Sequence, residues 1–315
     1  MQLVNYIKRL KTCLRHQDDS LVDAAENKIE DKQIDYKNKT FDYLTPPLLT
    51  KEQKNNWDKN GYLVLPGFFD ENRIDQINNL IDEIWANRKF DDNPLVIDAY
   101  LKPRGKRMYM RDVPDDARLQ PYKLNDLFLE SSLVQEIVLD LYLSQLLREL
   151  LEGSPLVCNS LTFEYGSQQP CHIDTFFMPP PVENKLVASW IALEDVNSDN
   201  GPLIYYPGSH KIAPYIFEDG TLVRTDKERP LCEKYIYDEI EKRKLKRVEF
   251  HAKKGDVLIW HAQLFHGGEA IKNNKLTRKS FVTHYFRKED FSENDTISLG
   301  HGRYYLKRDH QPVPG

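Results

Sequence analysis

Hydrophobic residues recur at helical spacing in the first part of the chain and at strand-like spacing after about residue 156. Apolar positions three and four residues apart indicate the buried face of a helix, whereas short apolar runs bounded by Gly and Pro indicate strands. The helical spacing occurs over residues 3–14, from about residue 51, after Asp70 and over residues 133–151. Asp70 is placed to cap the N-terminus of its helix, and a Gly-x-Pro sequence after residue 152 is a stop signal for the last one.

The second part of the chain has the pattern of many short strands. A run of short strands behind N-terminal helices predicts a mainly β protein, a jelly-roll barrel with helices packed on one face. The expected strands lie in the segments "GYLVLPG", "LVCNSLTFEYG", "CHIDTFF", "KLVASWIALEDV", "GPLIYYPGSH", "RVEFHAKKGDVLIWHA", "HGGEA" and "RKSFVTHYFRK".

The chain divides into an extension and one large domain. Residues 1–45 are mostly polar and predict a helical or linker extension, and the compact domain is expected over residues 46–315. Residues 213–247 form a long, charged, partly helical segment between two strands, which predicts a lid over the mouth of the barrel. Its "EKRKLKR" run either receives a phosphate-bearing substrate or is a solvated helix face.

Charge and cysteine content exclude several classes of protein. The chain has 44 Lys and Arg residues against 49 Asp and Glu residues, a net charge of −5, so no positive field attracts nucleic acid. The longest apolar runs are strand-sized and shorter than the roughly 20 residues of a membrane-spanning helix. Four cysteines without CxxC spacing, and no apolar signal sequence, predict reduced thiols in a soluble cytosolic protein.

A His-x-Asp pair in "CHIDTFF" is a candidate for half of a metal site. An Fe(II) centre that activates O2 needs two imidazoles and one carboxylate on one face of the metal. On a strand, His172 and Asp174 would point to the same side, although such a pair also occurs by chance on ordinary strands. The third ligand is expected from "GDVLIWHAQLFHGGEA". We choose His266, because the following glycines allow close approach of the backbone, whereas His261 is explained as a packed aromatic-like residue.

Arginine 278 is a candidate for binding an anion. In "TRKSFVTHYFR", Arg278, Ser280, Val282 and His284 alternate and so share one face of a strand. If that face is the barrel interior, Arg278 is a buried cation that needs an anionic partner, and a carboxylate matches the planar guanidinium. The alternative is a surface arginine on an edge strand.

These motifs, in this order, resemble the phytanoyl-CoA dioxygenase family of Fe(II)/2-oxoglutarate-dependent oxygenases, which have a double-stranded β-helix core. The resemblance covers about residues 46–290 and is most specific in "ASWIALEDVNSDNGPLIYYPGSHK". It implies Fe(II), 2-oxoglutarate and O2 as cofactor and cosubstrates. It assigns the iron ligands to His172, Asp174 and His266, and it assigns the cosubstrate contacts to Arg278, Trp190, Ser280 and an upstream cation, Lys123 or Arg118.

The sequence departs from the family pattern at two points. Gly268 stands where family members often have Ser or Thr, and the spacing from His266 to Arg278 is one residue longer than usual, which a bulge or longer turn at 272–276 would absorb. The retained Asp174 indicates a hydroxylase-type enzyme, because related halogenases replace this carboxylate by a small residue.

The resemblance implies oxidation of a substrate C–H bond with release of succinate and CO2. Phe176, Phe177 and Met178 are expected to wall the substrate site together with the 213–247 segment. We predict a small or medium polar metabolite of a biosynthetic pathway as substrate. The alternatives are an acyl-CoA hydroxylase of the same family, a non-catalytic jelly-roll protein that binds a ligand, and a cupin-like metal isomerase or lyase.

Overall fold

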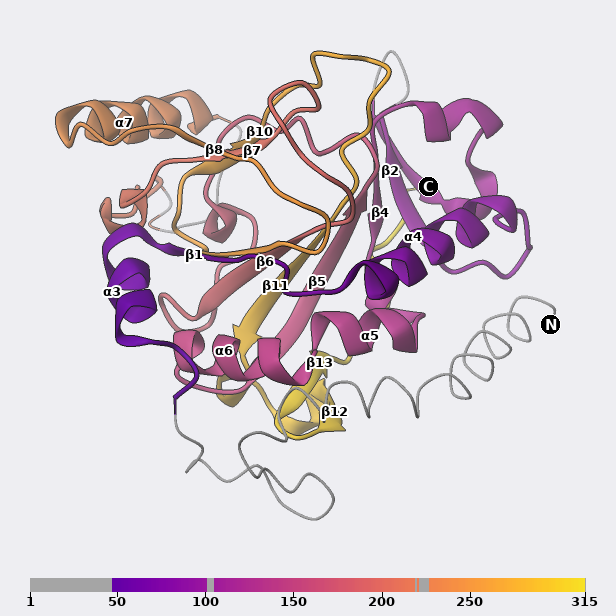
Figure 1. Ribbon diagram of the computed structural model, residues 1–315, viewed down its shortest axis with the longest axis horizontal. Helices are drawn as coiled ribbons and strands as arrows, with labels where there is room; N and C mark the ends of the chain where they lie inside the picture. The colour runs from indigo at the N-terminus through magenta and orange to yellow at the C-terminus, as the bar shows by residue number, and fades with distance from the viewer. Residues whose placement is uncertain (1–46, 101–104, 219, 221–226, 315) are drawn as a thin grey trace.

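The computed structural model describes residues 47–100, 105–218, 220 and 227–314, and the expected helix over 3–14 lies outside them. The described chain forms a mainly antiparallel sheet of ten strands facing a second sheet of three (Figure 1). The large sheet has the order β1-β9-β6-β11-β5-β4-β2-β3, with β13 also beside β5 and β12 beside β13. Its strands are β1 (Tyr62–Leu65), β2 (Val96–Ala99), β3 (Lys106–Tyr109), β4 (Tyr122–Asn125), β5 (Pro155–Phe163), β6 (Leu186–Ala192), β9 (Val257–His261), β11 (Ser280–Arg287), β12 (Thr296–Gly300) and β13 (Arg303–Leu306).

The small sheet lies over one face of the large one. It consists of β10 (His266–Gly268), β7 (Leu203–Tyr205) and β8 (Val248–Phe250), in that order. Side chains alternate along β6: Val187 and Ile191 pack in the cluster that contains the helices, whereas Ala188 and Trp190 pack in the cluster that contains the small sheet. This is the double-stranded β-helix architecture predicted from the motifs, and the alternation directs Trp190 between the two sheets.

Helices cover the opposite face of the large sheet, as predicted. They are α4 (Glu71–Ala86), α5 (Ser132–Val138) and α6 (Leu141–Leu151), while α3 (Lys51–Asn60) precedes β1 and α7 (Arg229–Lys242) lies in the 213–247 segment. Asp70 caps α4 by accepting a hydrogen bond from the backbone N–H of Arg73. The isoleucines of α4 are at most 7% exposed, which confirms the face expected from their spacing.

The structure corrects two features of the predicted fold. The helix expected over 133–151 is two helices, because Asp140 interrupts the apolar run and accepts hydrogen bonds from the N–H groups of Tyr142 and Leu143 at the start of α6. The strands β2, β3, β4, β12 and β13 were not expected. They are four or five residues long and carry charged residues such as Lys106 and Lys123, so their apolar pattern is weak.

A partly buried histidine pair joins β9 to the loop after β7. The rings of His210 and His261 lie 5.5 Å apart, and Gly61, at φ +77°, lets the backbone pass close to His210, where a Cβ would come within 2.5 Å of Nδ1. The Nδ1 atom of His261 accepts a hydrogen bond from the N–H of Gln263. Burial lowers the pKa of His261 to about 4 and also lowers the pKa of His210. Both rings are therefore neutral at pH 7.

Acid should destabilise the fold through this pair. The unfolded chain takes up a proton on His261 near pH 6.5 and the folded chain only near pH 4, so this contribution to stability is complete above pH 6.5 and is lost as the pH falls towards 4. At pH 5 the loss is about 2 kcal/mol. Urea denaturation at pH 7 and pH 5 should show a smaller pH effect for His261→Gln than for the wild type. His251→Gln, at an exposed histidine, is the control, and an equal acid loss in His261→Gln would contradict the prediction.

Candidate active site

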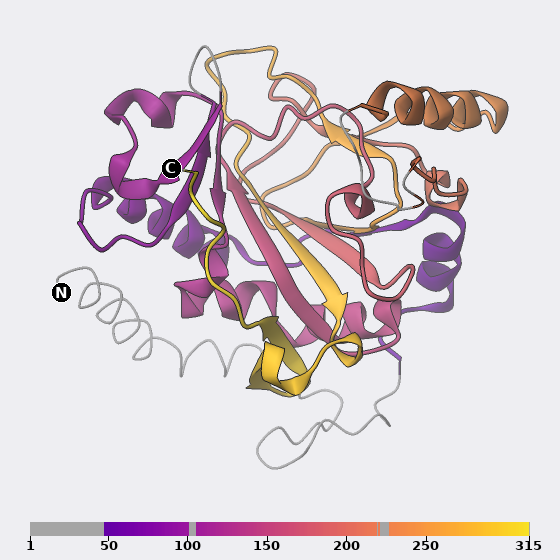
Figure 2. The same ribbon diagram turned by 180° about the vertical axis from the view of Figure 1, so that it is seen from behind.

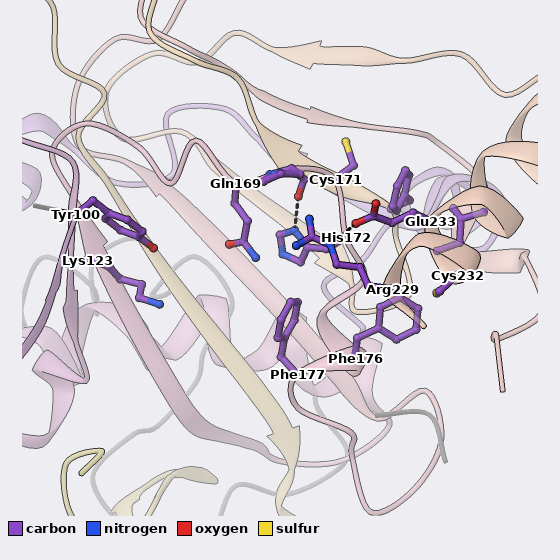
Figure 3. Close-up of a pocket in the computed structure, with 13 residues that line it drawn as sticks. Tyr100, Lys123, Gln169, Cys171, His172, Phe176, Phe177, Arg229, Cys232 and Glu233 are labelled. Carbon is purple, nitrogen blue, oxygen red and sulfur yellow. Dashed lines mark hydrogen bonds and ion pairs between the residues drawn. The ribbon is translucent and has the colours of Figure 1, made fainter. Parts of the chain in front are cut away.

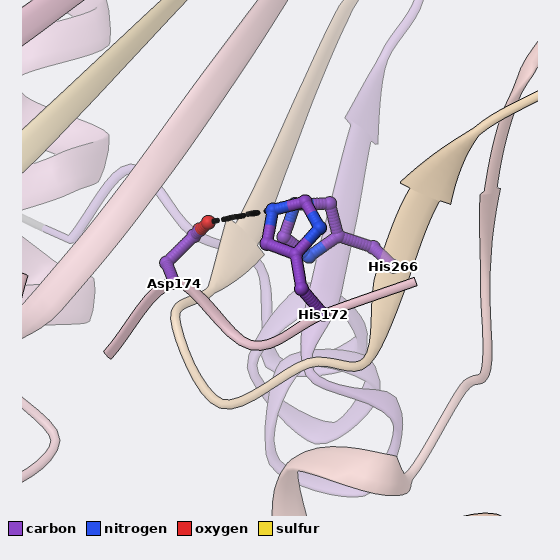
Figure 4. Close-up of side chains that lie close together, drawn as sticks. All are labelled: His172, Asp174 and His266. Atoms are coloured by element: carbon purple, nitrogen blue, oxygen red, sulfur yellow. Dashed lines mark ion pairs between the residues drawn. The ribbon is translucent and has the colours of Figure 1, made fainter. Parts of the chain in front are cut away.

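Three side chains predicted as metal ligands converge between the two sheets (Figure 4). The Oδ1 atom of Asp174 lies 3.5 Å from Nε2 of His172 and 3.6 Å from Nε2 of His266. All three ligand atoms lie within 4.8 Å of one another, close enough to share one ion. Asp174 and His266 are buried, and His172 is partly exposed.

The backbone places these ligands differently from the expected strand. His172 pairs with His266 through two backbone hydrogen bonds in an isolated bridge, and Asp174 begins a short 3-10 helix, Asp174–Phe176. The period-two argument for "CHIDTFF" was therefore wrong in detail. The side chains still meet because the bridge sets His172 beside β10, and the N–H of Asp174 donates to the carbonyl of Ala262 after β9.

Both histidines present Nε2 to the centre. Nδ1 of His172 lies 2.9 Å from the carbonyl oxygen of Pro170, and Nδ1 of His266 lies 2.9 Å from that of Leu264. A carbonyl only accepts, so each Nδ1 carries the proton and each Nε2 presents its lone pair, the arrangement of a metal-binding imidazole. Burial lowers the pKa of His266 to about 4. Burial alone would raise the pKa of Asp174, but the surrounding imidazoles hold it well below its usual range.

The second oxygen of Asp174 has partners of its own. Nε1 of Trp260 donates a hydrogen bond of 2.8 Å to Oδ2, and Nε2 of His284 lies 3.6 Å from the same atom. Neither contact was predicted. The alternation of β11 placed His284 on the interior face but gave no sign of its partner. His261, the other histidine of this segment, contacts Trp57 and His210 instead of the centre.

A cavity of about 60 Å³ adjoins the three ligands and contains the predicted arginine. Arg278 is 3% exposed, and its Nη1 donates to Oγ of Ser280 at 3.3 Å. Its Nε and the Nε1 of Trp190 have no hydrogen-bond partner among the residues that the structure describes. Burial lowers the pKa of Arg278 to about 10, so it remains a cation at pH 7. A buried cation and a buried N–H donor facing one cavity fit an anionic ligand.

The other predicted cosubstrate residues lie around this cavity at different distances from it. Ser280 is fully buried and contacts Arg278 without lining the cavity. Lys123 lines a neighbouring, larger pocket and pairs with Asp98 at 3.0 Å. Arg118 binds both carboxylate oxygens of Glu164, so its guanidinium is engaged in a structural contact.

The larger pocket has a volume of about 460 Å³ and lies on the open side of His172 (Figure 3). Tyr100 and Lys123 stand on one side of His172, and residues of α7 stand on the other. Gln169 and His172 line both the pocket and the smaller cavity. The pocket is lined by Tyr100, Lys123, Gln169, Pro170, Cys171, His172, Phe176, Phe177, Arg229, Cys232, Glu233, Ile236 and Phe265.

The walls of this pocket include two of the three residues expected there. Phe176 and Phe177 line it, whereas Met178 packs against a cluster of Cys158, Leu186 and Ala262. Met178 is thus a packing residue, because the 3-10 turn at Asp174 directs only the first two side chains towards the pocket. The lid expected in the 213–247 segment contributes α7 to the wall.

The chain is similar to known proteins over most of its length. Residues 57–280 match the family model described as phytanoyl-CoA dioxygenase (PhyH). Peroxisomal phytanoyl-CoA dioxygenase of Homo sapiens is 25% identical over 268 residues, which cover 78% of this chain and 71% of that protein. The Mus musculus enzyme is 24% identical over 254 residues, with the same coverage.

Solved structures share the fold at low sequence identity. Iron-bound EctD from S. alaskensis has a TM-score of 0.59 at 15% identity, covering 80% of this chain and 82% of its own. The carbocyclase SnoK from nogalamycin biosynthesis has a TM-score of 0.57 at 17% identity, covering 76% and 85%. Within the described residues, no helix is long and apolar enough to cross a membrane. With the family match extending over most of the chain, this protein belongs to the phytanoyl-CoA dioxygenase family and is a non-haem iron oxygenase dependent on 2-oxoglutarate.

Proposed function

We propose that His172, Asp174 and His266 hold Fe(II) and that Arg278 grips the distal carboxylate of 2-oxoglutarate. The observation that carries this proposal is the juxtaposition, across one small cavity, of two imidazole lone pairs and a carboxylate with a buried guanidinium whose Nε has no partner among the described residues. Bound Fe(II), with 2-oxoglutarate and O2, supplies the oxidising power for the substrate C–H bond and releases succinate and CO2.

The remaining residues of the cavity position these groups and exclude water. Trp190 offers its free N–H to the cosubstrate, and its ring lies under the guanidinium, 5.9 Å from the Arg278 Cζ atom. Ser280 fixes the guanidinium from behind. Leu161, Phe163 and Val282 give the cavity an apolar wall, which strengthens each polar contact made inside it. Lys123 remains the predicted upstream contact, reaching the cosubstrate from the side of the larger pocket.

The larger pocket is proposed to bind a small or medium polar metabolite. Its volume of about 460 Å³ is in the range of about 300–1,000 Å³ for small-molecule sites. Three phenylalanines provide apolar contact, while Lys123, Gln169, Arg229 and Glu233 provide charged and amide groups. EctD from S. alaskensis, which shares the fold, has been crystallised with 2-oxoglutarate and the small molecule 5-hydroxyectoine, which supports this choice. Acyl-CoA hydroxylation, suggested by the name of the mammalian relatives, is the second candidate.

The compartment is proposed to be the cytosol. Cys158, Cys171 and Cys232 are free thiols, and burial raises the pKa of the Cys171 thiol to about 11, so it stays unreactive. The mammalian relatives are named as peroxisomal proteins. Imaging of the tagged full chain would distinguish the two compartments.

An anaerobic titration tests the proposed cofactors. Fe(II) and 2-oxoglutarate added to the apoprotein should produce a weak visible charge-transfer band, which His172→Ala abolishes. Bound iron without the band would favour a cupin-like isomerase or lyase, and the band without succinate release on any substrate would favour a ligand-binding protein. A succinate-release screen over amino acids, small natural-product intermediates and acyl-CoA thioesters then identifies the substrate class.

Gly268 stands where family members often have Ser or Thr, and the hydroxyl of Ser167 lies close to this position. A Cβ at Gly268 would lie 2.6 Å from Oγ of Ser167 and 3.2 Å from Nη2 of Arg278, so the Ser167 hydroxyl occupies this space beside the guanidinium. We expect Ser167 to donate to the cosubstrate carboxylate. Ser167→Ala should weaken 2-oxoglutarate binding roughly tenfold, the effect of one hydrogen bond to a charged group.

A swap of the two positions tests this prediction. Gly268→Ser alone should weaken 2-oxoglutarate binding through collision with Ser167, and the double variant Ser167→Gly with Gly268→Ser should recover it. The measurement is the 2-oxoglutarate dissociation constant from the charge-transfer titration. Unchanged binding in Ser167→Ala would show that the hydroxyl only fills space.

A further inference from the structure

The two oxygens of the Asp174 carboxylate face different groups. Oδ1 faces the Nε2 atoms of His172 and His266, and Oδ2 faces away from them, towards Trp260 and His284. The Trp260 ring also lies beside the His266 ring at a tilt of 50°, with ring centroids 4.8 Å apart. A carboxylate held at one oxygen presents the other in a fixed direction, which is how partners behind a ligand orient it.

His284 is itself held by a buried polar chain. Nδ1 of His284 lies 3.2 Å from Oδ1 of Asn159, and Nδ2 of Asn159 donates to Oδ1 of Asp126 at 3.3 Å. Because a carboxylate only accepts, the Asn159 amide must turn its nitrogen to Asp126 and its oxygen to His284. The ring of His284 is thereby fixed with Nδ1 as the donor to Asn159. Its Nε2 lies 3.6 Å from Oδ2 of Asp174, too far for a hydrogen bond, so the ring limits the position of this oxygen by contact.

The row of buried polar contacts from His284 through Asn159 to Asp126 ends in an ion pair with the C-terminal segment. Arg308 pairs through Nη2 with Oδ2 of Asp126, whose side chain is fully buried. The segment reaches this point because β13 runs parallel to β5, with Tyr305 in register with Val157, and in Figure 2 the yellow chain after β13 continues alongside the strands. Arg308 supplies a positive charge at Oδ2, whereas the hydrogen bonds to Oδ1 come from neutral groups, the Asn159 amide and the backbone N–H of Ser160.

Apolar packing does not explain this row of buried polar side chains. Asn159, Asp126 and His284 are each at most 6% exposed, and burying such groups costs free energy unless every contact is made. Their place is also notable: His284 and Arg308 lie beyond the family match, which ends at residue 280.

We propose that Trp260 and His284 are positioning residues for the metal ligand Asp174, and that Asn159, Asp126 and Arg308 transmit this positioning from the C-terminal segment. The inference rests on the proposed role of Asp174 as an iron ligand. The C-terminal segment is therefore part of the support of the metal centre, although it lies outside the cavity.

Metal affinity in a double-variant cycle tests the inference. Co(II) is titrated into the full-length apoprotein, and the maximum of the anaerobic Fe(II)–2-oxoglutarate band and the thermal midpoint of the apoprotein are recorded for each variant. His284→Phe should weaken Co(II) binding roughly 10–100-fold, as expected for a partner behind a ligand, and should shift the band. Arg308→Met should weaken Co(II) binding severalfold, and Arg308→Lys should restore it. The double variant should bind no more weakly than His284→Phe, since the chain is already broken.

Lys307→Met is the matched control, because Lys307 is the exposed neighbour of Arg308 and its substitution by methionine also removes one positive charge. Unchanged Co(II) affinity and band in Arg308→Met, or effects of His284→Phe and Arg308→Met that add, would overturn the inference. A lower thermal midpoint with unchanged affinity and band would show a structural role only and also overturn it. If His284→Phe does not fold, His284→Gln takes its place as the proximal variant. Absence of metal binding in the wild type would instead refute the proposed function.

Discussion

Replacing His266 with alanine should abolish the Fe(II)–2-oxoglutarate absorption band and all substrate-dependent succinate release. The imidazole is one of three donors around the centre, and its Nε2 lies 3.6 Å from Oδ1 of Asp174. Its removal leaves one histidine and one carboxylate, too few to fix the metal with adjacent open positions. We expect metal affinity to fall by well over the roughly 10–100-fold that loss of an outer partner causes.

The measurement for His266→Ala is a Co(II) or Fe(II) titration with the thermal midpoint of the apoprotein as a check of folding. His251→Ala is the matched control, since His251 is exposed and pairs with Glu249. The apoprotein of His266→Ala should fold, because Leu264 and Phe265, which precede the histidine, remain buried in their clusters. Full metal affinity in this variant would exclude His266 as a ligand and would direct attention to His284, the other imidazole beside Asp174.

Sequence patterns predicted the parts of the fold that bury apolar residues at regular spacing. The face of α4 and the buried strands β5, β6 and β11 follow from periodicity alone, because burial of one face or of both faces of an element imposes that pattern. The strands β2 to β4 were missed, since they gain their stability from pairing in the sheet, β4 with β5, β2 with β4 and β3 with β2, instead of from an apolar pattern of their own.

The members of the candidate site were predictable where the type of residue and its order along the chain indicate the chemistry. His172, Asp174, His266 and Arg278 were chosen in this way and lie around one small cavity, although the backbone under Asp174 is a 3-10 turn and not a strand. Contacts between distant segments were not predictable: nothing near residue 126 or 308 indicates that they join beneath the metal centre. Such contacts depend on which strands become neighbours, and the order of the strands is determined by the packing of the whole sheet and not by any local segment.

Arg278→Met should separate cosubstrate binding from stability. The guanidinium is buried, its Nε has no partner, and within the described part of the chain no carboxylate forms an ion pair with it. We therefore expect this cation to serve a ligand. Its loss should raise the 2-oxoglutarate dissociation constant by roughly 10² or more, because breaking a buried charge pair costs about 2–5 kcal/mol. Metal affinity should be unchanged, since the ligands remain.

The same substitution should leave the apoprotein as stable as the wild type or more stable. Replacing a buried, poorly paired charge by an apolar side chain of similar length removes a desolvation cost, and such replacements are neutral or stabilising by about 1–4 kcal/mol. Thermal denaturation with and without 2-oxoglutarate and Co(II) measures both effects: the cosubstrate should raise the midpoint of the wild type and not that of Arg278→Met. Arg247→Met is the control, as Arg247 pairs with Glu249 and Glu269 at the surface. A large loss of apoprotein stability in Arg278→Met would show that the arginine is structural. Lost cosubstrate binding with retained stability would show that the desolvation cost of burying the arginine serves ligand binding and not folding.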